Sequence, residues 1–205
     1  MERVIALVVQ PGVDMGNDQL FAFDRAKAAS LSASAASLPG IVFEAHSTDF
    51  QSGAGLADLV AGHFPILKVG PSLTFAFREA LFAMTSMAEI LGLTEGQALF
   101  GALEAAMAAE PRHWRPYVTK GPRERLERLF GLSDRVRYYW PDPGVAAAAK
   151  ALRTAVDGAR IPPGLLSQCV GEPFFGASGA RLSERIIAHK VGAVVARYRR
   201  AAGWI

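Results

Sequence analysis

Three short segments in the first third of the chain are almost continuously apolar: 4–9 (VIALVV), 41–44 (IVFE) and 66–69 (ILKV). Runs of β-branched and aliphatic residues of this length are typical of strands in a parallel sheet that is covered on both faces. Helical stretches at 24–38 and 56–63 lie between them. The order strand, loop, helix, strand predicts βα units of a parallel α/β fold.

The remainder of the chain has a helical pattern. Residues 74–91 carry aromatic and aliphatic side chains at helical spacing, and we predict no strand beyond residue 92. Further helices are predicted between Pro and Gly breaks, at 97–110, 123–130, 145–156 and 182–202. The pattern therefore divides the chain into an α/β part, residues 1–92, and an α-helical part, residues 93–205.

The composition is that of a globular protein. The chain has 205 residues, of which 51% are hydrophobic and 20% charged, and its mean hydropathy is +0.20. These values exclude a disordered chain, a collagen-like repeat and a disulfide scaffold. The net charge of +3 is too small for the pI near 9.2 to indicate a nucleic-acid partner. The single cysteine, Cys169, excludes an internal disulfide and is compatible with a reducing cytosol.

The sequence predicts neither export nor membrane insertion. Met1-Glu2-Arg3 leads directly into an apolar segment that has no small-residue cleavage site after it. No apolar run reaches the ~18–20 residues that a membrane span needs. We therefore expect a cytoplasmic protein.

Polar residues follow the three predicted strands, where functional residues gather in parallel α/β folds. The first strand leads to Gln10, and the second contains Glu44 and leads to His46 and Asp49. Glu44 and His46 are two residues apart, so they lie on one side of an extended chain. Burial of both groups would be costly without a metal, a phosphate or a mutual hydrogen bond. The alternative is that His46 only forms a hydrogen bond to a neighbouring loop.

The third strand carries a lysine, Lys68, in an otherwise apolar segment. A lysine in a sheet crevice usually pairs with a carboxylate or a phosphoryl group, although a side chain that reaches solvent from a sheet edge would also explain it. Gly70 and Ser72 follow, and their backbone N–H groups could face a phosphate at the start of the next helix.

Residues 133–141 (SDRVRYYWP) combine arginine and aromatic residues at high density. This segment either stacks against a ligand or a partner subunit, or begins a helix whose aromatic residues pack inward. The chain contains no P-loop motif, no dinucleotide-binding G-x-G-x-x-G motif and no nucleophile elbow. We therefore expect no nucleotide cofactor, and no recognised motif supports nucleic-acid binding.

Three βα units do not form a stable parallel sheet by themselves, because both edges of so small a sheet would stay unpaired. Either a second chain completes the sheet, or the sequence is part of a larger fold.

Five segments are similar to one known family: VIALVVQPGVDMG, VFEAHSTDFQ, HFPILKVGPSLTFAFREALFAM, LSDRVRYYWPDP and IPPGLLSQCV. In order and spacing they resemble the non-catalytic subunit family of class II D-tagatose-1,6-bisphosphate aldolase, and the resemblance covers essentially the whole chain. Members of the family are (β/α)8 barrels related to zinc-dependent class II aldolases. The resemblance implies a partial (β/α)8 TIM barrel, formed by the last three βα units and followed by an α-helical C-terminal region. The chain would then be the C-terminal half of a member.

The resemblance also implies roles for individual residues. His46 matches a metal-binding histidine of the catalytic relatives, which implies a divalent metal such as zinc. Ser47, Lys68 and Gly70 match positions near the substrate phosphate, and we add Gln10 to this phosphate-binding set because it follows the first strand.

The function implied is that of an accessory subunit, which supports the activity and stability of a separate catalytic aldolase subunit in a hetero-oligomer that acts on a sugar phosphate. Some members resemble metal-dependent 4-epimerases of ketohexose 6-phosphates, and in that alternative Glu44 and Asp49 would be catalytic. A third alternative is an inactive truncated copy. The absence of a P-loop argues against the older description of such proteins as tagatose 6-phosphate kinases.

If the chain is half of a barrel, its strand edges and helix faces lack partners, and the isolated chain should be unstable, oligomeric or aggregated. Size-exclusion chromatography and thermal unfolding test this expectation. A cooperative transition in a monomeric sample would count heavily against a half-barrel.

Overall fold

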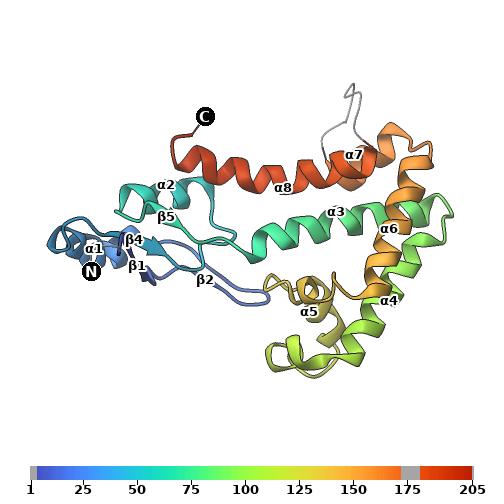
Figure 1. Cartoon of the computed structure of the whole chain (residues 1–205), viewed down its shortest axis with the longest axis horizontal. Helices are drawn as coiled ribbons and strands as arrows, with labels where there is room; N and C mark the ends of the chain where they lie inside the picture. The colour runs from blue at the N-terminus through green and yellow to red at the C-terminus, as the bar shows by residue number, and fades with distance from the viewer. Residues whose placement is uncertain (1–3, 172–180, 205) are drawn as a thin grey trace. The chain divides into compact units, whose positions relative to one another are not determined.

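The computed structural model describes residues 4–171 and 181–204; Met1–Arg3, on which the expectation about export depends, lie outside them. The chain forms two compact units (Figure 1). Unit 1 comprises Met1–Leu73, Gly131–Ser133 and Ala193–Ile205, and unit 2 comprises Thr74–Phe130 and Asp134–Gly192. These units divide the chain differently from the predicted parts 1–92 and 93–205.

Unit 1 contains the parallel sheet that the apolar runs predict. Its strands are β1 (Ala6–Val9), β4 (Val42–Ala45) and β5 (Ile66–Leu67), in the order β1-β4-β5. Both pairings are parallel, with Val8 opposite Glu44 and Glu44 opposite Ile66. The α/β class is therefore confirmed, with a small parallel sheet in a mostly helical chain.

The helices of unit 1 begin at side-chain caps. In α1 (Arg25–Ser34) the carboxylate of Asp24 accepts hydrogen bonds from the first backbone N–H groups, and in α2 (Gly53–Ala61) Ser52 does the same. A 3-10 turn, η1 (Ala35–Ser37), extends α1. The sequence pattern did not predict the two-residue strands β2 (Asp14–Met15) and β3 (Leu20–Phe21), which form an antiparallel hairpin.

The core of unit 1 covers one face of the parallel sheet. Side chains alternate between the two faces of a strand, and Phe43 and Ala45 are buried with Leu56 and Leu59 of α2. On the other face Val8 is 58% and Val42 39% exposed. The predicted cover on both faces is therefore present on one face only among the described residues.

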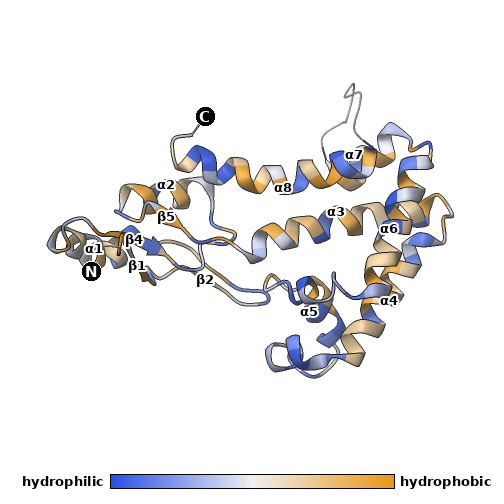
Figure 2. Cartoon of the chain, viewed as in Figure 1, coloured by the Kyte–Doolittle hydropathy of each residue, from blue (hydrophilic) through white to orange (hydrophobic). Residues whose placement is uncertain are grey.

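Unit 2 is helical, as predicted. It contains most of α3 (Pro71–Ile90) and α8 (Leu182–Ala201), with α4 (Glu95–Ala109), α5 (Glu124–Phe130), α6 (Pro143–Gly158), α7 (Pro163–Val170) and the 3-10 turns η2 (Pro111–His113), η3 (Arg115–Tyr117) and η4 (Arg135–Tyr138). Figure 2 shows the apolar residues distributed along these helices. Their buried side chains form one cluster, which includes Met84, Leu103, Leu129 and Leu152. In the described part of the chain no helix is long and apolar enough to cross a membrane.

An ion pair lies inside unit 2. The guanidinium group of Arg78 (α3) lies 3.4 Å from the carboxylate of Asp134, and both side chains are almost fully buried. Arg78 also donates to the backbone carbonyls of Leu129 and Phe130 and lies 4.1 Å from the ring centroid of Phe75. Burial lowers the pKa of Arg78 and raises the pKa of Asp134, and each effect is opposed by the charge of the partner. The Arg78 guanidinium group thus has a carboxylate, two carbonyl groups and an aromatic ring as its partners.

Removal of the charge of Asp134 should destabilise unit 2, because the buried guanidinium group would lose its counter-charge. Asp134→Asn keeps a side chain that tolerates the left-handed backbone of this position (φ 46°). We expect it to lower the free energy of unfolding by about 3 kcal/mol, measured by urea denaturation. The matched control is Glu184→Gln, which removes the charge from an exposed pair with Arg153 and should cost less than about 1 kcal/mol. Equal losses in the two variants would contradict the importance of burial.

Candidate functional site

The candidate site lies at the C-terminal ends of β1, β4 and β5. The hydrogen-bond ladder continues one residue beyond the strands, since the N–H of His46 donates to the carbonyl of Val9 (2.9 Å) and that of Lys68 to the carbonyl of Ala45 (3.0 Å). The register of the sheet therefore extends to His46 and Lys68. It places the residues that follow the strands next to one another, as expected for a parallel sheet.

Four of the predicted site residues share the exposed face of this sheet. Side-chain alternation places Glu44 and His46 on the same face of the β4 segment, with Gln10 beyond β1 and Lys68 beyond β5. Gln10, His46 and Lys68 are exposed and Glu44 is half-buried. One carboxylate, one imidazole, one amide and one ammonium group thus line one face and offer charges and hydrogen-bonding groups to a polar ligand.

The turn after β4 fixes the position of His46. Its Nδ1 forms a 2.7 Å hydrogen bond with the hydroxyl of Ser47, the next residue of the same turn. Ser47 and Phe50 both have left-handed backbones, with φ of 59° and 58°. Two such residues in four positions are uncommon and carry backbone strain, which clusters at functional sites.

Asp49 lies apart from the exposed face. Its side chain is buried, and Oδ1 accepts hydrogen bonds from the N–H groups of Gly70 (3.0 Å) and Ser72 (2.8 Å). The carboxylate therefore occupies the start of α3, where a negative charge is favourable. The Gly70 N–H, which the sequence suggested for a phosphate, is donated to this internal carboxylate.

The structure also shows a contact that the sequence analysis missed. The hydroxyl of Tyr198 (α8) donates to the backbone carbonyl of Thr48 (2.6 Å) and lies 3.2 Å from the Thr48 hydroxyl. The Thr48 hydroxyl in turn donates to the carbonyl of Lys68 (2.9 Å). Desolvation by burial raises the pKa of Tyr198 to about 12. Tyr198 thus anchors the turn that carries His46, and no local sequence signal links positions 150 residues apart.

Gln51 fixes the other end of the same turn. Its side-chain oxygen accepts from the N–H of Phe23 (2.9 Å), and its amide nitrogen donates to the carbonyl of Phe21 (3.0 Å). The side chain is buried. The hairpin segment and the turn after β4 are therefore held together by one amide.

The donor set for a metal ion is small in this region. Within residues 4–171 and 181–204 no three His, Cys, Asp or Glu side chains are grouped so that they could hold a metal ion. Among the predicted residues, His46 and Glu44 share a face and could supply two ligands, whereas Asp49 already accepts two backbone hydrogen bonds. A metal bound here would need further ligands from outside this set.

Comparisons with known proteins match nearly the entire chain. The sequence profile of the family described as D-tagatose-1,6-bisphosphate aldolase subunit GatZ/KbaZ-like matches residues 1–203. The D-tagatose 6-phosphate 4-epimerase of Agrobacterium fabrum is 45% identical over 98% of this chain and 48% of its own length. The D-tagatose-1,6-bisphosphate aldolase subunit GatZ of Klebsiella pneumoniae is 39% identical over 97% of this chain and 48% of its own length.

A solved structure is also similar. The crystal structure of a probable tagatose 6 phosphate kinase from Sinorhizobium meliloti superposes with a TM-score of 0.89 and is 43% identical, over 98% of this chain and 53% of that chain. The chain thus spans about half the length of the relatives that it matches.

The anchor formed by Tyr198 can be tested with Tyr198→Phe, which removes only the hydroxyl. Loss of the hydrogen bond to Thr48 should lower the free energy of unfolding at neutral pH by about 1 kcal/mol. Tyr138→Phe is the control, because Tyr138 is 42% exposed and its hydroxyl should contribute less. If both variants unfold at the same urea concentration, the hydroxyl of Tyr198 is not an anchor.

The raised pKa of Tyr198 also predicts a pH dependence. Between pH 10 and pH 12 the phenol is ionised in the unfolded chain but stays protonated in the folded chain. The folded state then binds more protons, so the stability that this group contributes is lost as the pH rises through this window. Wild type should therefore lose stability more steeply than Tyr198→Phe above pH 10, measured by urea denaturation. Parallel pH profiles would contradict the assignment.

Proposed function

Since this chain belongs to the D-tagatose-1,6-bisphosphate aldolase subunit GatZ/KbaZ-like family, we propose that it is an accessory, non-catalytic subunit of class II D-tagatose-1,6-bisphosphate aldolase. The observation that carries the proposal is the 39% identity to the Klebsiella aldolase subunit over 97% of this chain. The reaction served is cleavage of tagatose 1,6-bisphosphate into glycerone phosphate and glyceraldehyde 3-phosphate. The catalytic step belongs to a separate aldolase subunit, which this chain activates and stabilises.

The role of Asp49 in the structure supports an accessory role. A general acid or base needs a carboxyl group that can reach the substrate. Asp49 is buried, and its Oδ1 is engaged by two backbone N–H groups. Its task in this chain is therefore to join the turn after β4 to the start of α3.

We further propose that the three parallel strands are the last three strands of a (β/α)8 barrel. Consecutive strands lie side by side and parallel, and helices α1 and α2 follow β1 and β4 in the sequence. The face with Val8, Val42 and Ile66 would line the barrel interior, since these apolar side chains are 36–58% exposed. A barrel of this type takes about 250 residues and eight strands, so the three parallel strands of this chain would supply only part of one.

A metal-dependent 4-epimerase of D-tagatose 6-phosphate is the second candidate, favoured by the 45% identity to the Agrobacterium epimerase. In this alternative His46 would supply a ligand to a divalent ion such as zinc, which would polarise a substrate oxygen when bound. Lys68, Gln10 and Ser47 would bind the phosphate, and Glu44 or Asp49 would move the proton. The buried position of Asp49 favours Glu44 for that task. In either case we expect a cytoplasmic protein, in keeping with the free thiol of Cys169.

The accessory role predicts that the chain changes the behaviour of a catalytic partner. The catalytic subunit of a class II tagatose-bisphosphate aldolase is assayed for cleavage of tagatose 1,6-bisphosphate, with and without this chain. We expect faster cleavage and slower thermal inactivation, because binding at about a hundredfold excess over Kd stabilises a folded partner by about 2.7 kcal/mol. An unrelated globular protein at the same concentration is the control. No change in either property would reject the accessory role.

The two candidates differ in their dependence on His46. We expect His46→Asn to leave partner-dependent aldolase activity intact if the chain is accessory. If the chain is an epimerase, the variant should lose bound metal, measured by elemental mass spectrometry, together with 4-epimerase activity. His63→Asn is the matched control, because His63 is exposed at the end of α2 and has a left-handed backbone (φ 73°) that asparagine tolerates. Stoichiometric metal and epimerisation without any partner would overturn the accessory role.

A further inference from the structure

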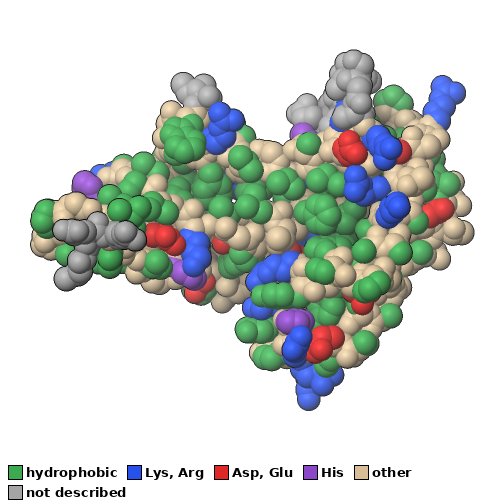
Figure 3. Space-filling model, in the orientation of Figure 1, with side chains coloured by type: hydrophobic (Ala, Val, Ile, Leu, Met, Phe, Trp, Pro, Cys, Tyr) green, Lys and Arg blue, Asp and Glu red, His purple; other side chains and the backbone are tan. Residues whose placement is uncertain are grey.

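Positive charge is concentrated in one part of unit 2. Residues 110–140 contain eight of the 22 Lys and Arg residues of the chain but only four of its 19 Asp and Glu residues. The same segment contains three of the four tyrosines. Figure 3 shows Lys and Arg side chains together with a histidine and hydrophobic side chains over the segment that follows α4. This part of the chain therefore differs in chemistry from the rest.

The arginine and aromatic side chains of this segment are stacked on one another. The rings of His113 and Tyr138 are stacked at 4.7 Å with an interplanar angle of 11°. Arg137 donates to the Tyr138 hydroxyl (2.9 Å) and lies over its ring, and Arg112 donates to His113 (3.3 Å). Four side chains from η2 and η4 thus form one continuous row.

Two further arginine–aromatic contacts lie in the same unit. The guanidinium group of Arg135 is 3.4 Å from the ring centroid of Tyr117, and that of Arg115 is 5.7 Å from the ring centroid of Trp114. Tyr117 is 53% and Tyr138 42% exposed. An arginine already held against a ring loses less conformational freedom when it binds a carboxylate. These arginine side chains are therefore already ordered before a partner binds.

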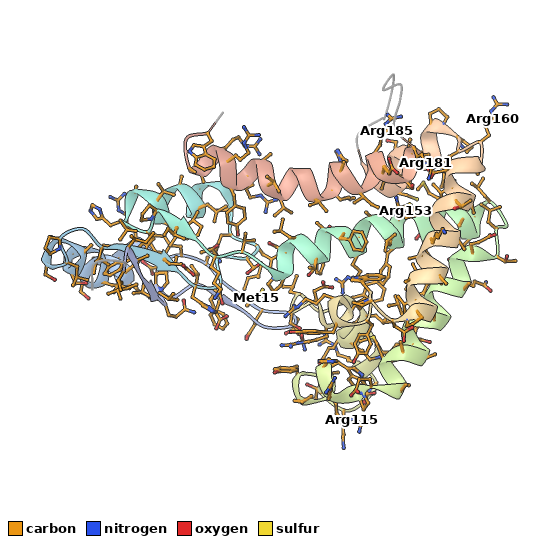
Figure 4. The ribbon with its side chains drawn as sticks, in the orientation of Figure 1. Met15, Arg115, Arg153, Arg160, Arg181 and Arg185 are labelled. Atoms are coloured by element: carbon orange, nitrogen blue, oxygen red, sulfur yellow. The ribbon has the colours of Figure 1, made fainter. Side chains whose placement is uncertain are left out.

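A cavity of about 300 Å³ lies beside these stacks. Its lining includes Trp114, Arg115, Lys120 and Glu124. Figure 4 shows Arg115 extending away from the helices of unit 2. The cavity is large enough to accept a side chain of a partner, and Arg115 and Lys120 would attract a carboxylate into it.

We propose that the surface formed by residues 111–120 and 135–138 is a docking surface for a protein that presents a carboxylate-rich face. This inference rests on the proposed function, and it names the catalytic aldolase subunit as that protein. Arginine, tyrosine and tryptophan are the residues that most often dominate binding energy at protein interfaces. The excess of positive charge orients the partner as it docks, and burial of the two exposed tyrosine rings contributes to the affinity.

A protein partner fits this surface better than a nucleic acid. Three carboxylates, Glu110, Glu124 and Glu127, are interspersed among the cations. The regularly spaced phosphates of a nucleic acid would meet these negative charges. A protein face can match a mixed pattern, with its own cations opposite the carboxylates and its carboxylates opposite Arg115 and Lys120.

The test measures the Kd between this chain and the catalytic aldolase subunit by surface plasmon resonance. Arg115→Glu combined with Lys120→Glu reverses two exposed cations of the docking surface. Arg160→Glu combined with Lys150→Glu is the matched control, because these residues are exposed on unit 2 but outside the surface, and Figure 4 shows Arg160 far from Arg115. We expect roughly tenfold weaker binding for the first variant and less than a twofold change for the control.

A third variant, Tyr138→Ala, separates aromatic contact from charge and should also weaken binding by roughly tenfold. Salt should weaken wild-type binding and affect the Arg115→Glu, Lys120→Glu variant less, since screening acts on the charges that the variant removes.

If wild type binds and the docking and control substitutions weaken binding equally, the proposed surface is wrong but the accessory function stands. If wild type does not bind, the proposed function fails with it. Binding of wild type to a DNA duplex, lost in the Arg115→Glu, Lys120→Glu variant, without any binding to the subunit would identify a nucleic-acid surface instead.

Discussion

The candidate site depends on the hydrogen bonds of two adjacent residues, Thr48 and Asp49. Asp49 accepts from the N–H groups of Gly70 and Ser72, and this joins the turn after β4 to the start of α3. Thr48 donates its hydroxyl to the carbonyl of Lys68, and its own carbonyl accepts from Tyr198. Because charge-assisted hydrogen bonds are stronger than neutral ones, the Asp49 carboxylate is the centre of this arrangement. Three segments of the chain meet there: the turn after β4, residues 68–72 and α8.

The polar residues of the site therefore have two different roles. Thr48 and Asp49 are buried and satisfy backbone groups, whereas Glu44, His46 and Lys68 point to the open face of the sheet. A buried group with its hydrogen bonds complete holds geometry. The exposed groups can therefore exchange water for a ligand without loss of the turn that positions them. The strained backbone at Ser47 is maintained by the same bonds.

Local patterns in the sequence predicted the three parallel strands, the α-helices other than α7, and the face shared by Glu44 and His46. Apolar runs and turn residues encode these features within a few positions, and the alternation of a strand requires no tertiary information. The capping role of Asp49 was not predicted, because its donors lie 21 and 23 residues away and an acidic residue after a strand also fits a catalytic role. Tyr198 lies 150 residues from Thr48. The hairpin of β2 and β3 was missed because two-residue strands carry no periodicity.

The buried ion pair of unit 2 has a bearing on the docking surface. Asp134 directly precedes η4, and the guanidinium group of Arg137 donates to its backbone carbonyl (3.4 Å). The attraction between Arg78 and Asp134 therefore fixes the point from which Arg137 and Tyr138 extend. A hydrophobic replacement of such a pair is often as stable as the pair itself, so stability alone does not explain its presence. Its presence is explained by the placement of the stacked row at the surface. A displacement of Asp134 would also displace the η4 residues that contact a partner.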